Sequence, residues 1–349
     1  MDKVSIAGCV LIATCHVSCT SDHSVDTGRS KTPEAGTAAD KSSSSSPCRW
    51  RVGARELGPA LDEVQFFDSF MAFGIDDQCV WSTDNGGQSW AQRYCHSTPD
   101  GRTERIHHLL MVTTKTGWMV GGGDLLHTSD GGRRWERKSL PGIVIRSVRF
   151  LNHDMGWLAG ERSRDAPPYI QGVVYKTRNG GQTWTQSKLG ITETSEWRLS
   201  NIWPISADVI WVVGDFLLYT KDSGQQWKKA SLEAEVLLRL RNVSLQFRGE
   251  NTGWIQRMPP NDYLVTDDGG ATWVVRKLPH ASRGQLIHVL PDLAWRVDGD
   301  IWRSEGDGWE LELAVFDKGN GYTRLQYIES EKTIVAIGSK LIASCQLHL

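Results

Sequence analysis

Residues 128–135 read TSDGGRRW, and the pattern that they follow, Thr-x-(Asp/Asn)-x-Gly-x-x-Trp, returns along the chain. Four more segments match it in full: 83–90 (TDNGGQSW), 177–184 (TRNGGQTW), 220–227 (TKDSGQQW) and 266–273 (TDDGGATW). A shortened copy lies at 304–309 (SEGDGW). The closing tryptophans are 45, 49, 43, 46 and 36 residues apart, which indicates an internal repeat.

An apolar run precedes each copy of this box, as at 117–121 (GWMVG), 156–160 (GWLAG) and 211–214 (WVVG). Weaker runs begin at Met71, Trp254, Trp295 and Val335, so the units number seven. Seven repeats of about 43 residues need about 301 residues. Residues 48–349 supply 302, so the repeat accounts for the whole of this region.

Each unit is expected to contain four short strands, with the box as the turn between the third and the fourth. The Asp or Asn side chain of the box can bond to backbone N–H groups downstream, and its glycines supply positive φ. The box Trp is expected to fill the space between neighbouring sheets. Because no helical period appears, the sequence predicts an all-β fold, a seven-bladed β-propeller.

The two ends of the repeat region complement each other. The last unit stops after 341–345 (LIASC) without a box or a fourth strand, whereas residues 50–58 (WRVGARELG) look like a fourth strand without its own unit. We therefore predict that the N-terminal strand completes the last blade. In this alignment Cys48 faces Cys345, and Cys79 faces Cys95, so two disulfides are predicted, with four reduced cysteines as the alternative.

The region before the propeller has a different composition. Residues 1–19 suit a signal peptide of the lipoprotein type, with Cys19 as the expected lipidation site, although the residue three before it is His16. A better lipobox match ends at Cys9 but begins very early. Residues 20–47 are Ser-rich and are expected to form a disordered tether. The prediction is an exported lipoprotein of the periplasm or outer surface, and the alternative is a disordered extension of a cytoplasmic protein.

Composition and motifs exclude several function classes. The 39 basic and 41 acidic residues leave a net charge of −2, which removes bulk attraction to nucleic acid. No P-loop, Cys-x-x-Cys or dinucleotide fingerprint is present. His107 and His108 are adjacent in an expected strand, so their rings should point to opposite faces. We expect no cofactor, no metal and no nucleic acid, and a monomer held at the membrane by its lipid anchor alone.

The box is the Asp-box, or BNR repeat, first associated with sialidases. The fuller unit, GW-x-x-G followed by an apolar strand and the box, resembles the photosystem II assembly/stability factor family over nearly all of residues 48–349. The resemblance implies a non-catalytic scaffold that binds a protein partner, such as a subunit of a membrane complex, during assembly. It does not establish a photosynthetic host.

An enzyme is the alternative that the Asp-box suggests. A sialidase needs an arginine triad, a Tyr–Glu nucleophile pair and an acid Asp, and the early Arg-Ile-Pro signature is absent. Other glycosidases need two carboxylates a defined distance apart. The candidates by residue type are Asp62, Glu63, Asp124, Glu161, Asp165, Asp215 and Asp298. We expect no enzyme and no catalytic residues, and keep a carbohydrate-binding or sialidase-like glycoside hydrolase propeller as the alternative. A purely structural envelope protein is a third class.

Arginines recur near the start of the first strand in six of the seven units, where a propeller would bring them to one mouth of its central channel. They are Arg105, Arg146, Arg198, Arg241, Arg283 and Arg324, joined by Arg149. A basic ring there would bind carboxylates or phosphates bidentately, and the family resemblance implies an arginine patch for partner contact. Trp197 and Trp203 are predicted partner-binding aromatics beside it. The alternatives are arginines paired with acids of neighbouring blades, and Trp203 in the core.

Overall fold

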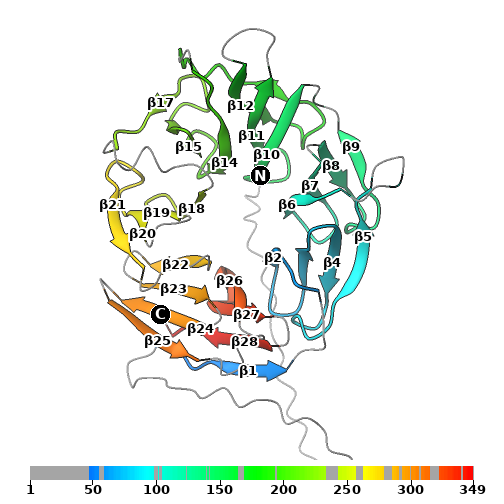
Figure 1. The fold of residues 1–349 in the computed structure, drawn as a ribbon, viewed down its shortest axis with the longest axis vertical. Helices are drawn as coiled ribbons and strands as arrows, with labels where there is room; N and C mark the ends of the chain where they lie inside the picture. The colour runs from blue at the N-terminus through cyan, green and yellow to red at the C-terminus, as the bar shows by residue number, and fades with distance from the viewer. Residues whose placement is uncertain are drawn as a thin grey trace, which may run out of the picture.

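The computed structural model describes residues 47–348, apart from short gaps, of which the longest are 164–168, 233–242, 257–261, 279–284 and 315–321. The predicted signal peptide, Cys19 and all but the last residue of the tether lie outside the described residues. So do Arg241 and Arg283. The described residues form seven four-stranded antiparallel sheets, and Figure 1 shows these sheets following one another around a ring. The predicted seven-bladed propeller is confirmed.

The blades are numbered here from one to seven in chain order. The first two contain β2 (Glu63–Phe66), β3 (Ala72–Ile75), β4 (Cys79–Thr83) and β5 (Ala91–Cys95), then β6 (Ile106–Met111), β7 (Gly117–Gly121), β8 (Asp124–Thr128) and β9 (Glu136–Lys138). The next two contain β10 (Ile143–Phe150), β11 (Gly156–Ser163), β12 (Ile170–Thr177) and β13 (Thr185–Gln186), then β14 (Leu199–Pro204), β15 (Ile210–Gly214), β16 (Leu217–Thr220) and β17 (Lys228–Lys229).

The fifth and sixth blades contain β18 (Ser244–Arg248), β19 (Thr252–Gln256), β20 (Asp262–Thr266) and β21 (Val274–Lys277), then β22 (Leu286–Leu290), β23 (Leu293–Asp298), β24 (Asp300–Glu305) and β25 (Gly308–Leu313). The seventh blade contains β26 (Tyr322–Ile328), the short helix η1 (Glu329–Glu331), β27 (Thr333–Gly338), β28 (Leu341–Gln346) and, as its outer strand, β1 (Arg51–Ala54). The N-terminal strand therefore completes the last blade, as the sequence predicts (Figure 1).

The box forms the turn between strands three and four, and the third strand ends at the box Thr in the five blades with a complete box. In the second blade, Thr128 Oγ1 donates to Asp130 Oδ1 and accepts from Gly132 N–H, both at 3.0 Å. Asp130 Oδ1 also accepts from two backbone N–H groups further on. Gly131 and Gly132 have φ of 75° and 77°. The fourth blade places Ser223 at the first of these positions, with φ 61°.

The box residues also pack against the preceding blade. Trp118 of β7 packs edge-on against the box residue Trp184 of the next blade, with ring centroids 6.0 Å apart. Trp211 of β15 and the box residue Trp273 repeat this contact at 5.8 Å. A Cβ at Gly181 would overlap the Trp118 ring, so this box position requires glycine. The repeat therefore encodes both a turn and an interface between blades.

The box carboxylates predict how stability changes with acid. Hydrogen bonds from the Thr272 hydroxyl and the Thr272 N–H lower the pKa of Asp268 to about 2. A carboxylate whose pKa is lower in the folded state stabilises the fold above the unfolded pKa of about 4. This contribution is lost as the pH falls toward 2.

In thermal unfolding measured by circular dichroism between pH 7 and pH 2, Asp268→Asn should therefore reduce the loss of Tm below pH 4. Asn occupies the same position in two natural boxes, as Asn85 and Asn179, so the Tm at pH 7 should change by less than about 3 °C. The assignment would be contradicted if Tm fell below pH 4 by the same amount in the variant and in the wild type.

Candidate functional site

The innermost strands carry the predicted arginines, but not at equivalent positions. Arg105 and Arg198 directly precede β6 and β14, each of which has a register shift shortly after its start. Arg146 lies at the register shift of β10, between Ile145 and Ser147, and Arg324 follows the shift in β26. Bulges of this kind redirect the side chains that follow them. The repeat therefore brings arginines of similar sequence position to different places at the channel mouth.

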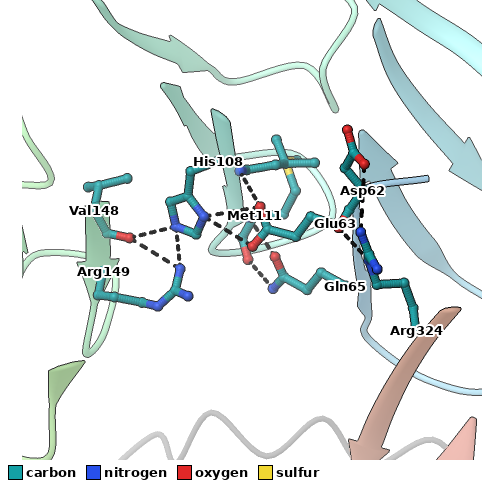
Figure 2. Close-up of polar contacts among 9 residues, drawn as sticks. Asp62, Glu63, Gln65, His108, Met111, Val148, Arg149 and Arg324 are labelled. Atoms are coloured by element: carbon teal, nitrogen blue, oxygen red, sulfur yellow. Dashed lines mark hydrogen bonds and ion pairs between the residues drawn. The ribbon is translucent and has the colours of Figure 1, made fainter. Parts of the chain in front are cut away.

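Every predicted arginine within the described residues has a polar partner, and four of them pair with carboxylates. Arg105 Nε lies 2.8 Å from Asp77 Oδ1 of the first blade, and Arg324 Nη2 lies 3.6 Å from Asp62 Oδ1. The carboxylate of Glu161 joins two blades, with Arg146 Nη2 at 2.5 Å and Arg198 Nε at 3.1 Å. Figure 2 shows Asp62 and Arg324 facing each other.

We call Arg324, Arg105, Arg146 and Arg198, which follow the mouth from the seventh blade to the fourth, the arginine arc. Their side chains are 29%, 65%, 44% and 41% exposed, so each keeps donors available to solvent. The alternative of arginines paired with acids therefore holds for these four residues, which leaves their role in partner contact a prediction. Acids from the loops and strands beside them neutralise much of the charge, and the result is a mixed arc of guanidinium and carboxylate groups.

Burial and neighbouring charges shift the pKa values of Asp62 and His107 at this mouth. Burial and then the nearby Asp77 carboxylate raise the pKa of Asp62, and Arg324 opposes them. Burial, followed by the positive charges of Arg105 and Arg146, lowers the pKa of His107. His107 is thus close enough to both arginines to respond to their charge.

A second set of polar side chains runs through the innermost strands of four consecutive blades. The carboxylate of Glu63 on β2 lies 3.0 Å from His108 Nδ1 on β6, and the Glu63 Oε2 atom accepts from Leu109 N–H at 2.9 Å. His108 Nε2 faces the guanidinium of Arg149 on β10, and this guanidinium lies 5.3 Å from the ring centroid of Trp203 on β14. Figure 2 shows the Glu63–His108–Arg149 part of this series.

His108 connects three groups of the inner strands. Its Nδ1 can donate to Glu63, while its Nε2 faces both the Arg149 Nη1 donor and the Val148 carbonyl oxygen, the latter at 3.1 Å. Burial alone would raise the pKa of Glu63, but His108, Arg149 and the Leu109 N–H together hold it below its usual value. Burial lowers the pKa of the Arg149 guanidinium, and Glu63 opposes this. Glu63 and His108 belong to no sequence motif, so no pattern in the sequence indicates this role.

The channel itself contains a cavity of about 800 Å³, lined among others by Arg149, Arg324 and Trp203. Glutamines also line it and join the innermost strands of neighbouring blades. Gln65 exchanges two hydrogen bonds with the backbone of Met111, at 2.7 and 2.8 Å, as Figure 2 shows. Gln326 does the same with Phe66 of the first blade. These side chains satisfy strand edges that would otherwise face water.

The two predicted tryptophans have different environments. Trp203 is half-buried, lines the cavity and stacks with Arg149, so it stays a predicted contact residue. Trp197 is 1% exposed and belongs to the core cluster between the third and fourth blades. The prediction of Trp197 as a partner-binding aromatic is therefore wrong, because its ring is covered by neighbouring core side chains such as Phe216.

The cysteines pair as predicted, Cys48 with Cys345 and Cys79 with Cys95, with Cα atoms 5.7 and 4.0 Å apart. The first pair joins the N-terminal segment to β28, and the second joins β4 to β5. Disulfides of this kind require an oxidising compartment. Within the described residues, no group of three His, Cys, Asp or Glu side chains is placed to hold a metal ion. The described part of the chain likewise has no helix long and apolar enough to span a bilayer.

The fold and this mouth define a class: a disulfide-containing Asp-box β-propeller with a mixed arginine–carboxylate arc around one end of its channel. Part of the chain, residues 142–239, matches the family model described as photosynthesis system II assembly factor YCF48. The resemblance predicted from the repeat is thus confirmed at modest identity.

Two curated relatives show the same likeness. The photosystem II assembly lipoprotein Ycf48 of Synechococcus sp. (strain CC9902) is 30% identical over 146 residues, which are 41% of this chain and 41% of that protein. The chloroplastic photosystem II stability/assembly factor HCF136 of Oryza sativa subsp. japonica is 30% identical over 118 residues, 34% of this chain and 26% of that protein. The chain therefore matches less than half the length of these relatives.

Solved structures support the fold. A structure titled YCF48 bound to D1 peptide has a TM-score of 0.60 at 17% identity, and covers 89% of this chain and 100% of its own. An ancestral GH74 enzyme reaches the same TM-score at 12% identity, over 82% of this chain and 45% of its own. At these identities both matches show the propeller architecture alone.

Proposed function

We propose that this protein is a non-catalytic scaffold that binds a subunit of a membrane complex during assembly, and that the arginine arc is its contact surface. The observation that carries the proposal is the arc itself. Four guanidinium groups from different blades are oriented by carboxylates yet remain 29–65% exposed. Groups held in place by such ion pairs lose little conformational freedom when they bind a partner. Arg149 and Trp203 extend this surface into the channel.

The comparisons support the same class of function. The matched relatives are named assembly factors, and one related structure is titled as bound to a D1 peptide. We infer that the present chain likewise takes a peptide segment of a membrane protein. We also propose that it is exported and anchored through Cys19, since one relative is named a lipoprotein and the two disulfides suit an oxidising compartment.

The test is recovery of the partner from membranes of the protein's own host. The tagged full chain is compared with Arg105→Gln/Arg198→Gln, and co-purified proteins are quantified by mass spectrometry. Arg133→Gln/Arg134→Gln is the matched control, because these two exposed arginines belong to a box turn of the second blade and not to the arc. We expect one membrane-complex subunit to be enriched by the wild type and the control, and at least tenfold less by the arc variant. Equal recovery with the arc variant would contradict the proposed surface.

A further inference from the structure

A groove on another part of the surface separates the third and fourth blades. It has a volume of about 570 Å³, and its walls are the outer part of the third blade and the box turn of the fourth. Three basic side chains, Lys176, Arg178 and Lys188, line it together with the hydroxyl groups of Ser187 and Ser223. Among the described residues that line it, none belongs to the arginine arc.

The groove is elongated. A second hollow of about 340 Å³ shares Gln186, Ser187 and Lys188 with it and continues to Gln171 and Gly172. The two hollows together follow β12 from Lys176 back to Gln171, a run of about 17 Å for an extended strand. A segment of five or six residues in extended conformation has about this length.

The outer strand of the third blade, β13, is short, so a segment in the groove can lie against its edge. β13 contains only Thr185–Gln186, and Ser187 N–H then makes a last bond to Val174 O at 2.8 Å. Short outer strands are places where a partner chain can add main-chain hydrogen bonds, while side-chain pockets or charges select its sequence.

The charge of the groove is positive and incompletely compensated. Arg178 and Lys188 are exposed, and in the described part of the chain neither has an ion-pair partner. Lys176 Nζ donates to Ser223 O at 3.2 Å and lies 5.2 Å from the Trp157 ring centroid. Burial and then the charge of Arg178 lower the pKa of Lys176, and only Asp208 opposes them. A ligand carboxylate would relieve this repulsion.

We propose that this groove binds an extended acidic peptide segment, and so forms a second interaction surface separate from the arginine arc. Its length suits a chain of five or six residues, its three cations suit Asp or Glu side chains, and the Ser187 hydroxyl can donate to the same carboxylates. The Ser223 hydroxyl is already bonded within the fourth blade, to Ala207 O and Asp208. An open groove of this shape encloses too little of a small molecule to bind it firmly.

The test measures binding of a fluorescein-labelled ten-residue peptide of alternating Glu and Ser to the full chain, by fluorescence anisotropy at 50 and 300 mM salt. The variant Arg178→Glu/Lys188→Glu changes two exposed side chains. Arg133→Glu/Arg134→Glu makes the same change of charge on the second blade. We expect at least tenfold weaker binding for the groove variant, a change below threefold for the control, and binding by the wild type that weakens with salt.

Hydrogen exchange locates the peptide independently of mutation. Protection should appear in residues 170–176 and 185–191 and be retained in Arg105→Gln/Arg198→Gln, which separates this surface from the proposed arc. No binding by the wild type, equal weakening by both charge-reversal pairs, or protection at the channel mouth alone would overturn the proposal. So would binding of heparin at the groove with no binding of the peptide, because the ligand would then be a sulfated polysaccharide.

Discussion

Replacing Cys48 and Cys345 together by serine should lower the free energy of unfolding by about 5 kcal/mol. The bond joins positions 297 residues apart, and the loop-entropy model gives about 5 to 6 kcal/mol for closing so long a loop. It also holds β1 beside β28, so that its loss lets the seventh blade open at its outer strand. Denaturant unfolding followed by Trp fluorescence measures the change.

The second disulfide is the matched control for this prediction. Cys79 and Cys95 are only 16 residues apart, so the same model gives about 3 kcal/mol for the Cys79→Ser/Cys95→Ser pair. Its loss should loosen the outer strand of one blade and leave the ring closed. The idea that ring closure depends on the long-range bond would be wrong if the 79/95 pair proved the more costly one.

Replacing Glu312 by alanine should lower the free energy of unfolding by about 3–5 kcal/mol, the usual cost of breaking a buried ion pair. Glu312 on β25 is 4% exposed. Its Oε1 lies 2.8 Å from Arg303 Nε, and its Oε2 accepts from the indole N–H groups of Trp50 and Trp295 at 2.7 and 2.8 Å. One carboxylate therefore attaches the N-terminal segment to the sixth blade, and its removal leaves buried donors unpaired.

Two further variants separate the roles of this carboxylate. Glu312→Gln keeps an acceptor for the indoles but removes the charge beside Arg303, so its cost should be intermediate. Glu305→Ala removes an exposed partner of the same arginine and should cost less than about 1 kcal/mol. Thermal and denaturant unfolding of the three variants test the order. If Glu305→Ala and Glu312→Ala lowered the free energy of unfolding equally, the buried carboxylate would contribute no more to stability than the exposed one.

The fold was predictable because each repeat contains the residues that form its own turn. The box residues Thr128, Asp130 and Gly132 specify a turn through contacts with one another, over at most a few positions. Such contacts do not depend on the remainder of the chain, and seven copies leave few architectures other than a closed ring. The missing fourth strand of the last unit and the surplus N-terminal strand then indicated how the ring closes, and the cysteine positions followed from that alignment.

The candidate site was predictable only in part, because it is assembled between blades. Glu63 and His108 are 45 residues apart and neither recurs in the repeat, so no sequence pattern marks them as partners. The arginines were visible as a class, but their acid partners come from neighbouring blades and loops, as Asp77 does for Arg105. Trp197 looked like a surface aromatic in a loop, and contacts with the next blade bury it.

The repeat, the number of blades, the closing strand and the cysteine pairs could be inferred from the sequence, because they depend on local turn chemistry and on counting. The pairing of charges, the exposure of aromatic rings and the position of a groove between blades became known from the folded structure. Those properties depend on distances between residues of different repeats. Bulges in the innermost strands and the loops between strands set these distances, and neither follows from the period of the repeat.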